Sequence, residues 1–167
     1  AKYGAYDAID RIYRNTDGIP NVIDSVLKNL SVTGLSGLSA ISSDVAGKEV
    51  IVSTGNDALK DMILDIGNSP DPALKRSYDL LKALTIFPQG EQLQRIKYLN
   101  PRAPFYYSSV HELKSRGLVS TVETETLGIY QASTENTIIV NRLAREVLIN
   151  MLNPAQFRDL NRKAADL

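Results

Sequence analysis

The stretch 106-YYSSVHELKSRGLVSTVETETLGI-129 decides the fold of this chain. Three of its apolar residues recur at i, i+4 and i+7, so they share one face of a predicted helix: Tyr106, Val110 and Leu113. Arg116-Gly117 ends that helix, with a cation in its last turn and a glycine free to adopt positive φ just beyond it. Leu118-Val119 then starts an extended run, and Leu127-Gly128 predicts a turn before the next strand. A helix followed by a two-stranded ribbon indicates the second half of a winged helix.

The overall composition narrows the classes of protein. The chain has 167 residues, 43% of them apolar, enough for one ordinary domain or two small ones with a packed core. Its 19 basic and 19 acidic residues cancel, which argues against a protein whose main task is gripping nucleic acid. Cysteine is absent and His111 is the single histidine, which argues against metal sites. The absence of cysteine makes a cytoplasmic setting the default expectation. No apolar run reaches the ~18 residues that a membrane span needs.

The first 69 residues predict a helical unit. We expect a helix over Ala5–Asn15 whose inward stripe is Tyr6, Ile9 and Tyr13. Thr16-Asp17-Gly18 breaks that helix, and Pro20 starts a second one, because its missing N–H has no partner in a first turn. The second helix has a broad apolar face made of Val22, Ile23, Val26, Leu27 and Leu30.

A less regular segment, Thr33–Asn56, separates the second helix from a third. Its part KEVIVST, residues 48–54, predicts a short strand or an extended buried segment, which periodicity does not distinguish. The third helix is predicted over Asp57–Ile66, capped by Asn56 or Asp57. Its inward residues are Leu59, Met62, Ile63 and Ile66.

Residues 67–72, GNSPDP, form the predicted boundary, since two prolines prevent a helix from passing through. Residues 70–152 then predict the winged helix. Its expected elements are helices over Ala73–Phe87 and Glu91–Leu99, the helix and ribbon described above, a closing strand over Thr137–Val140, and a helix from Asn141 to Met151. Residues 153–167 predict the first helix of a truncated C-terminal helical region, with a regular apolar face made of Phe157, Leu160, Ala164 and Leu167. The fold class is therefore mainly α with a small β-ribbon.

A winged helix suggests DNA binding through its third helix, where we single out Ser108, Lys114 and Arg116. The charges argue against it. Basic residues occur only near the end of that helix, and Glu123 and Glu125 give the wing the sign that repels phosphates. A packing and regulatory role fits better, and nucleic acid is not the expected partner. His111 fits the surface or core edge better than a pH switch or a ligand. Paired carboxylates at Asp7/Asp10, Asp61/Asp65 and Glu123/Glu125 fit solvated faces, so no catalytic residue and no metal site is predicted.

The most site-like segment is 16-TDGIP-20. A glycine and a proline on either side of one apolar residue predict a rigid kink between two helices. Such a kink can lay an apolar edge and a helix N-terminus against a ligand. A simple helix–helix turn explains the same residues equally well.

The order of these parts resembles the back half of the nucleotide-binding module of STAND ATPases, which include the NB-ARC proteins and the MalT-like regulators. In that family a P-loop ATPase core precedes a small helical lid and a winged helix. The resemblance rests on YRNTDGIPNVIDSVLKNL (13–30), which is similar to the lid with its G-x-P motif, on YDLLKALTIFPQG (78–90), and on VHELKSRGLVS (110–120) followed by YQASTENTIIVNRLAREVL (130–148). FRDLNRKAADL (157–167) resembles the helix that leads into the family's repeats, whereas Thr33–Asn56 has no counterpart there.

The resemblance implies that residues 1–69 are the lid and that Gly18, Ile19 and Pro20 contact nucleotide, with Pro20 packing against it. Many relatives have a Met-His-Asp triplet at the end of the winged helix, where this chain has Val140-Asn141-Arg142. Asn141 can donate a hydrogen bond to phosphate but carries no charge, and capping of the following helix explains it as well. The chain itself would lack cofactors and would not be an enzyme. ATP or ADP with Mg would bind in the parent protein.

The implied partners are an upstream P-loop domain, downstream helical repeats and, in the parent, further copies in a self-assembly. Two alternatives remain open. One is a DNA-binding winged helix of a transcription regulator or of an origin-recognition-type ATPase. The other is an interaction module that docks through the face of Phe157, Leu160 and Leu167.

Overall fold

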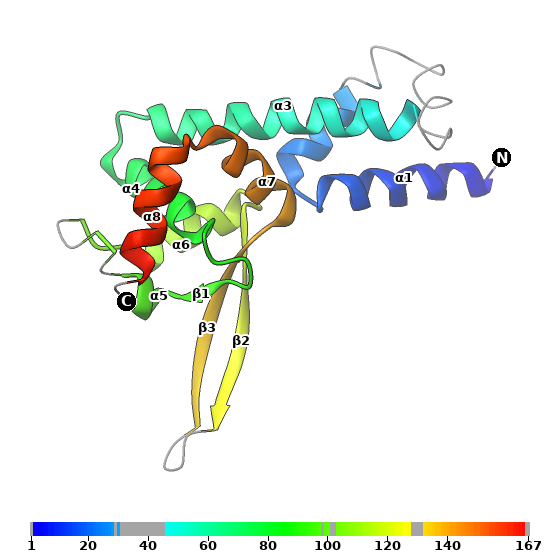
Figure 1. Cartoon of the computed structure of the whole chain (residues 1–167). Coiled ribbons are helices and arrows are strands. Elements are labelled where there is room, and N and C mark those ends of the chain that lie inside the picture. The colour runs from blue at the N-terminus through cyan, green and yellow to red at the C-terminus, as the bar shows by residue number, and fades with distance from the viewer. Residues whose placement is uncertain are drawn as a thin grey trace. The chain divides into compact units, whose positions relative to one another are not determined.

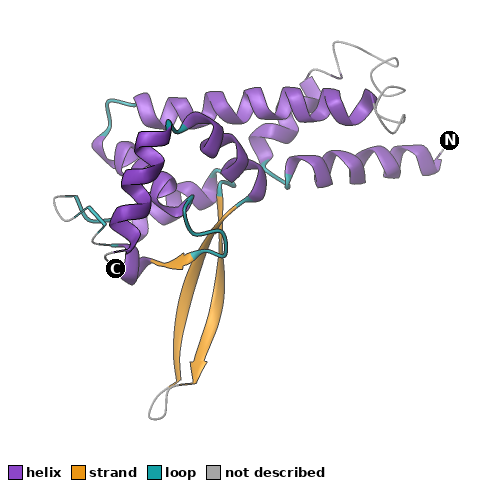
Figure 2. Ribbon diagram, viewed as in Figure 1, coloured by secondary structure: helices purple, strands orange, loops and turns teal. Residues whose placement is uncertain are grey.

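The computed structural model describes residues 2–28, 30, 46–97, 99–100, 103–127 and 132–165. It is mainly helical with a three-stranded antiparallel sheet, as the sequence predicts (Figure 1, Figure 2). The chain divides into two compact units, Ala1–Met62 and Ile63–Leu167, so the first unit ends inside a helix. Each unit is described by itself.

The first unit contains α1 (Lys2–Thr16), a helical run over residues 20–28, and the first part of α3 (Ala46–Asn68). A buried cluster joins the first two helices: Ala8, Ile12, Val26 and Leu30, with Ile23 packed beside it. The predicted stripe of α1 is therefore wrong where side chains are described, because Ile9 and Tyr13 are 64% and 62% exposed. The buried residues Ala8 and Ile12 precede them by one position, which is about 100° around a helix. Tyr6 lies outside the residues whose side chains are described.

The prediction of a strand or an extended segment over residues 48–54 is wrong, because these residues belong to helix α3. Asn56 and Asp57 consequently lie inside the helix and are not its caps. Valine and isoleucine lower helix propensity by only a few tenths of a kcal/mol each, and extending an existing helix gains one hydrogen bond per residue. The predicted inward residues of this helix are all buried: Leu59, Met62, Ile63 and Ile66.

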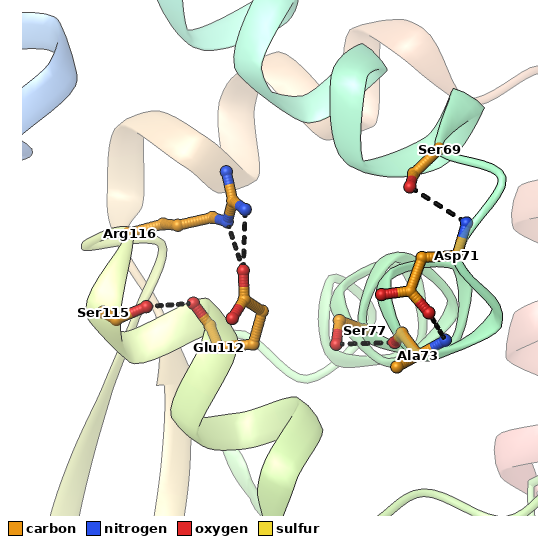
Figure 3. Close-up of polar contacts among 7 residues, drawn as sticks. All are labelled: Ser69, Asp71, Ala73, Ser77, Glu112, Ser115 and Arg116. Carbon is orange, nitrogen blue, oxygen red and sulfur yellow. Dashed lines mark hydrogen bonds and ion pairs between the residues drawn. The ribbon is translucent and has the colours of Figure 1, made fainter.

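The predicted break between α3 and α4 (Pro72–Leu84) is confirmed at residues 69–71. Asp71 is the N-cap of α4, and its Oδ1 accepts a hydrogen bond from the Ala73 amide at 2.8 Å (Figure 3). Ser69 Oγ accepts in turn from the Asp71 amide at 3.1 Å. Leu80, Leu81 and Leu84 are fully buried, so α4 is a core helix of the second unit.

The predicted helix Glu91–Leu99 is wrong at its start, because Glu91–Gln92 form a short strand, β1, before helix α5 (Leu93–Ile96). Glu91 pairs with Ile138 and Gln92 with Thr137 of β3. Gly90 explains this close approach. Its φ is +83°, and a Cβ on it would lie 2.6 Å from the Ile138 carbonyl oxygen.

The opening stretch forms α6 (Tyr107–Ser115) and β2 (Val119–Leu127), followed by β3 (Ala132–Val140). The sheet order is β1-β3-β2, and Val119 pairs with Val140 at the base of the ribbon. A helix, a strand, two helices and two strands, with the first strand beside the last, make a winged helix. The ribbon projects beyond the helices of its unit (Figure 1). The predicted turn at residues 127–128 reaches residues 128–131, which lie outside the described part.

The helix end at Gly117 follows the prediction closely. Gly117 has φ +73°, its amide donates to the Lys114 carbonyl, and the Leu118 amide donates to the Leu113 carbonyl, each at 3.0 Å. This pair of bonds is a Schellman motif, and both leucines are fully buried. Tyr106 departs from the predicted apolar face, because it is the N-cap residue and is 44% exposed.

Helices α7 (Arg142–Met151) and α8 (Pro154–Ala165) end the described chain. Asn153 Oδ1 accepts from the Gln156 amide at 2.8 Å, and Gln156 Oε1 accepts from the Asn153 amide at 3.1 Å. This reciprocal pair is a capping box, which satisfies two amides at the start of α8. The helix has no fully buried residue, and its predicted face is half-buried at Phe157, Leu160 and Ala164. Leu167 lies outside the described residues.

Candidate functional site

The corner between α1 and residue 20 is held by its own backbone. Asp17 and Gly18 both have positive φ, +50° and +69°. The Gly18 amide donates to the Tyr13 carbonyl at 3.3 Å, the long bond of a Schellman ending, and the Ile19 amide donates to the Thr16 carbonyl at 3.0 Å. Two consecutive left-handed residues turn the chain sharply at this corner.

Buried side chains also stabilise this corner. Thr16 is fully buried, and its Oγ1 donates to the Ile12 carbonyl at 2.8 Å. Ile19 is 0% exposed, and its carbonyl accepts the amides of Val22 and Ile23 at 3.1 and 3.0 Å. Burial of a complete isoleucine side chain contributes about 1.5–3 kcal/mol. The corner is therefore anchored rather than loose.

The three residues predicted to contact nucleotide here differ in access. Pro20 is exposed on the first turn of the following helix, Gly18 is half-buried, and the Ile19 side chain is inaccessible. A ligand at this corner would meet the Pro20 ring and the backbone at Gly18. Ile19 would act as the anchor that fixes both.

Asn141, the fourth predicted contact, lies in the second unit, and Gly18–Pro20 lie in the first. It is the N-cap residue of α7, as predicted, but its side chain makes no capping hydrogen bond. Its Nδ2 instead donates to the Gly117 carbonyl, and its backbone amide donates to the Leu118 carbonyl at 3.0 Å. Asn141 thus joins the end of α6 to the start of α7.

Sequence reasoning missed a related contact. Arg145, one turn further along α7, donates from Nε to the Thr85 carbonyl at the end of α4, at 3.0 Å. Thr85 is fully buried, so this bond satisfies a carbonyl at a helix terminus within the protein. The signal available in the sequence was only an arginine on a helix after the closing strand, which does not reveal its partner. Together, Asn141 and Arg145 tie α7 to both α6 and α4.

The outer face of α6 bears on the DNA-binding alternative. Ser108 is exposed, as predicted, but both cations are engaged inside the domain. Lys114 Nζ donates to Thr121 Oγ1 at 2.8 Å, and Arg116 lies 2.7 Å from the Glu112 carboxylate through Nε and Nη2 (Figure 3). A phosphate would have to compete with these contacts, which weakens the case for DNA binding.

The remaining ionisable candidates whose side chains are described lie on solvated surfaces. His111 and Glu123 are exposed, and Asp10 pairs with Arg14 at 2.9 Å on the surface of α1. In the described part of the chain, no group of three or more histidine, aspartate or glutamate side chains is placed to hold a metal ion.

A cleft of about 250 Å³ lies in the second unit between α4, the residues Leu99, Asn100 and Phe105, and α8. Its charged residues are paired on each wall, Lys82 with Asp79 at 2.7 Å and Lys163 with Asp159 at 2.8 Å. The hydrogen bond from Lys163 holds the pKa of the Asp159 carboxyl below its ordinary value, and the charge of Arg162 acts in the same direction. This cleft has no net charge to select a ligand.

Comparisons with protein-family models, curated proteins and solved structures found no match to this chain. None of the helices in the described ranges is long and apolar enough to cross a membrane.

Proposed function

We propose that this chain is the lid and winged-helix regulatory part of a nucleotide-switched signalling or defence ATPase. It closes over ATP or ADP held by a P-loop domain elsewhere in the parent protein. Exchange of the nucleotide changes how the lid and winged helix lie against that domain and so controls assembly. The observation that carries the proposal is the anchored Thr16–Pro20 corner, with its exposed proline within the G-x-P motif.

The chemistry of the corner suits an adenine or ribose face. An exposed proline ring is apolar and rigid, and contact with it costs little conformational entropy because the ring has no rotamers to lose. Fully buried Thr16 and Ile19 fix the position of the ring. Differential contact of this kind, present with one nucleotide and altered with the other, is what a ligand-driven switch requires.

Asn141 has a supporting role in this proposal. Its bond to Gly117 uses one of its two amide hydrogens, so the other hydrogen and the amide oxygen can still meet a phosphate or a bridging water. The chain itself would not hydrolyse ATP, because the phosphate- and magnesium-binding groups belong to the P-loop domain. The winged helix then serves as a packing and regulatory domain.

Two measurements test the proposal. The reading frame upstream of residue 1 should encode a G-x-x-x-x-G-K-S/T motif, and its absence there would refute the proposal. In the parent protein, Pro20→Ala should speed the release of a fluorescent ADP analogue several-fold, measured by stopped flow. Pro154→Ala is the matched control, since Pro154 is also exposed on the first turn of a helix. Equal release rates for both variants would contradict a nucleotide contact at the corner.

A further inference from the structure

Strand β2 forms one edge of the sheet, because within the described part of the chain it pairs with β3 alone. At the base of the ribbon, the Asn141 amide donates to the Leu118 carbonyl at 3.0 Å, so these two residues form a hydrogen-bonded pair of the ladder. Hydrogen-bonded pairs alternate along an antiparallel ladder, so the even-numbered residues of β2 bond to β3. The backbone groups of its odd-numbered residues point outward, where another strand can bond to them.

The side chains in this part of β2 lie on two faces of the ribbon. Thr121 and Glu123 share one face, because they are two positions apart, and Val122 lies on the other. Glu123 is exposed, and Val122 is 49% exposed. Lys114 of α6 lies on the face of Thr121, since its Nζ donates to Thr121 Oγ1 at 2.8 Å. That hydroxyl is neutral and accepts one of the three ammonium hydrogens, so Lys114 can also meet a carboxylate placed opposite Thr121.

We propose that two copies of the chain pair antiparallel along their β2 edges, about a two-fold axis that passes through Val122. In this register, Thr121 of each copy lies opposite Glu123 of the other, and both are residues whose backbone groups point outward. Each such pair exchanges two backbone hydrogen bonds. Side chains directly opposite each other share a face, so Glu123 comes beside Lys114 of the other copy. On the opposite face, the two Val122 side chains meet across the axis.

The charges of the chain select this register over its neighbours. An axis one residue further out would place the two Glu123 carboxylates opposite each other, and an axis two residues further out would oppose Glu123 and Glu125. An axis one residue nearer the base would bring the two Lys114 side chains together. Like charges directly opposite each other destabilise a pair of strands. The axis at Val122 avoids these repulsions and gains two attractions between Lys114 and Glu123.

Sedimentation of the 167-residue chain over a concentration series tests the contact, independently of nucleotide binding. The chain should form a dimer and no larger species, because a two-fold contact is closed. Lys114→Glu and Glu123→Lys should each weaken the dimer by about tenfold, since each turns both attractions into repulsions. The two variants mixed should form a heterodimer, because both contacts then join opposite charges.

A second mixture controls for net charge. Asp61→Lys changes the net charge as Glu123→Lys does, but at an exposed position on α3. Mixed with Lys114→Glu, it should pair more weakly than Glu123→Lys does, because one of the two contacts stays repulsive. Equal pairing in the two mixtures would show attraction between net charges alone and would contradict the proposed contact.

Cysteine cross-linking tests the register, since the chain has no cysteine of its own. Val122→Cys should form an intermolecular disulfide readily under mild oxidation, because the two Cβ atoms across the axis would lie about 4.5–5.5 Å apart. Ser120→Cys is the matched control, since Ser120 is exposed and lies on the same face as Val122. The two copies of Ser120 would be offset by four residues, about 14 Å, and should not cross-link. A disulfide that forms as readily at Ser120 as at Val122 would overturn the register.

Three sedimentation results would overturn the inference: a chain that stays monomeric, a dimer unaffected by both charge reversals, or a mixture that forms no heterodimer. Far-UV circular dichroism checks that each variant is folded. If Lys114→Glu disturbs α6, Val122→Lys replaces it, because it sets two ammonium groups against each other across the axis. That variant should abolish the dimer, whereas Ile9→Lys, at an apolar residue that is 64% exposed on α1, should behave as wild type. A dimer that survives Val122→Lys would contradict the proposed contact.

Discussion

Replacing Gly18 by alanine should destabilise the first unit without changing any side chain of its core. Gly18 has φ +69°, a conformation in which a Cβ approaches the following carbonyl. A Cβ built there would also lie 2.9 Å from Cε2 of the Tyr13 ring. Two separate costs therefore fall on this one substitution.

The magnitude follows from these two terms. The left-handed conformation costs an alanine about 1–2 kcal/mol relative to glycine. The Tyr13 ring is 62% exposed, so it can rotate away at a cost of only about 0.5 kcal/mol, the lower end for an off-rotamer side chain. The free energy of unfolding of the first unit should fall by about 1.5–2.5 kcal/mol. Gly18→Asn should cost less than alanine despite its larger side chain, since asparagine tolerates this conformation better.

Urea unfolding followed by circular dichroism at 222 nm measures the loss, and amide hydrogen exchange in α1 assigns it to the first unit. Gly4→Ala, at a glycine inside helix α1, is the control. That control should be neutral or slightly stabilising. The reasoning is refuted if Gly18→Ala is neutral, or if Gly18→Asn is as destabilising as Gly18→Ala.

Three further outcomes are expected. Asn141→Ala should lower the free energy of unfolding of the second unit by about 1–3 kcal/mol, because it leaves the Gly117 carbonyl without its side-chain donor. Urea unfolding measures this change, and an unchanged unfolding midpoint would contradict the hydrogen bond. The lowered pKa of Asp159 means that its stabilisation of α8 is present above the ordinary carboxyl pKa and is lost as pH falls below about 4 through the folded value. Lys163→Ala should move the Asp159 pKa back up, as a carboxyl NMR titration would show, and an unmoved pKa would contradict that cause. Duplex DNA should bind the chain only weakly in a gel-shift assay, with no change on Lys114→Ala, whereas tight binding with a steep salt dependence would restore the DNA-binding alternative.

The sequence predicted the winged helix better than it predicted the helices of the first unit. The helix end at Gly117 could be predicted from the sequence. Helices often end at a residue with positive φ, a conformation that glycine adopts without steric cost. The helical structure of residues 48–54 could not be predicted, since a short run of β-branched residues favours a strand locally. These residues are helical because they lie inside the continuous helix α3. In α1, we expected Ile9 and Tyr13 in the core because their side chains are large. The small residue Ala8 is buried instead.

The candidate site was also predictable only in part. The Thr16–Pro20 kink was predictable, because glycine and proline restrict the backbone locally. The side-chain bond of Asn141 to Gly117 spans 24 residues, and the Arg145 bond to Thr85 spans 60. No local pattern encodes partners at such separations, since they depend on how the helices pack. Strand β1 was missed for a similar reason, because two residues carry no alternation and only Gly90 permits their approach to β3.

The ribbon has a mechanical consequence. Each of its strands has nine residues, so at about 3.4 Å per residue the paired part is roughly 30 Å long. The third strand supports only its base, at Thr137 and Ile138, and leaves the outer part as an unsupported lever. A tilt of about 10° at that base would move the far end by about 5 Å, given this length. Small changes at Gly90 or at the Val119–Val140 pair would therefore be magnified at the outer end of the ribbon, at the Leu127–Ala132 pair.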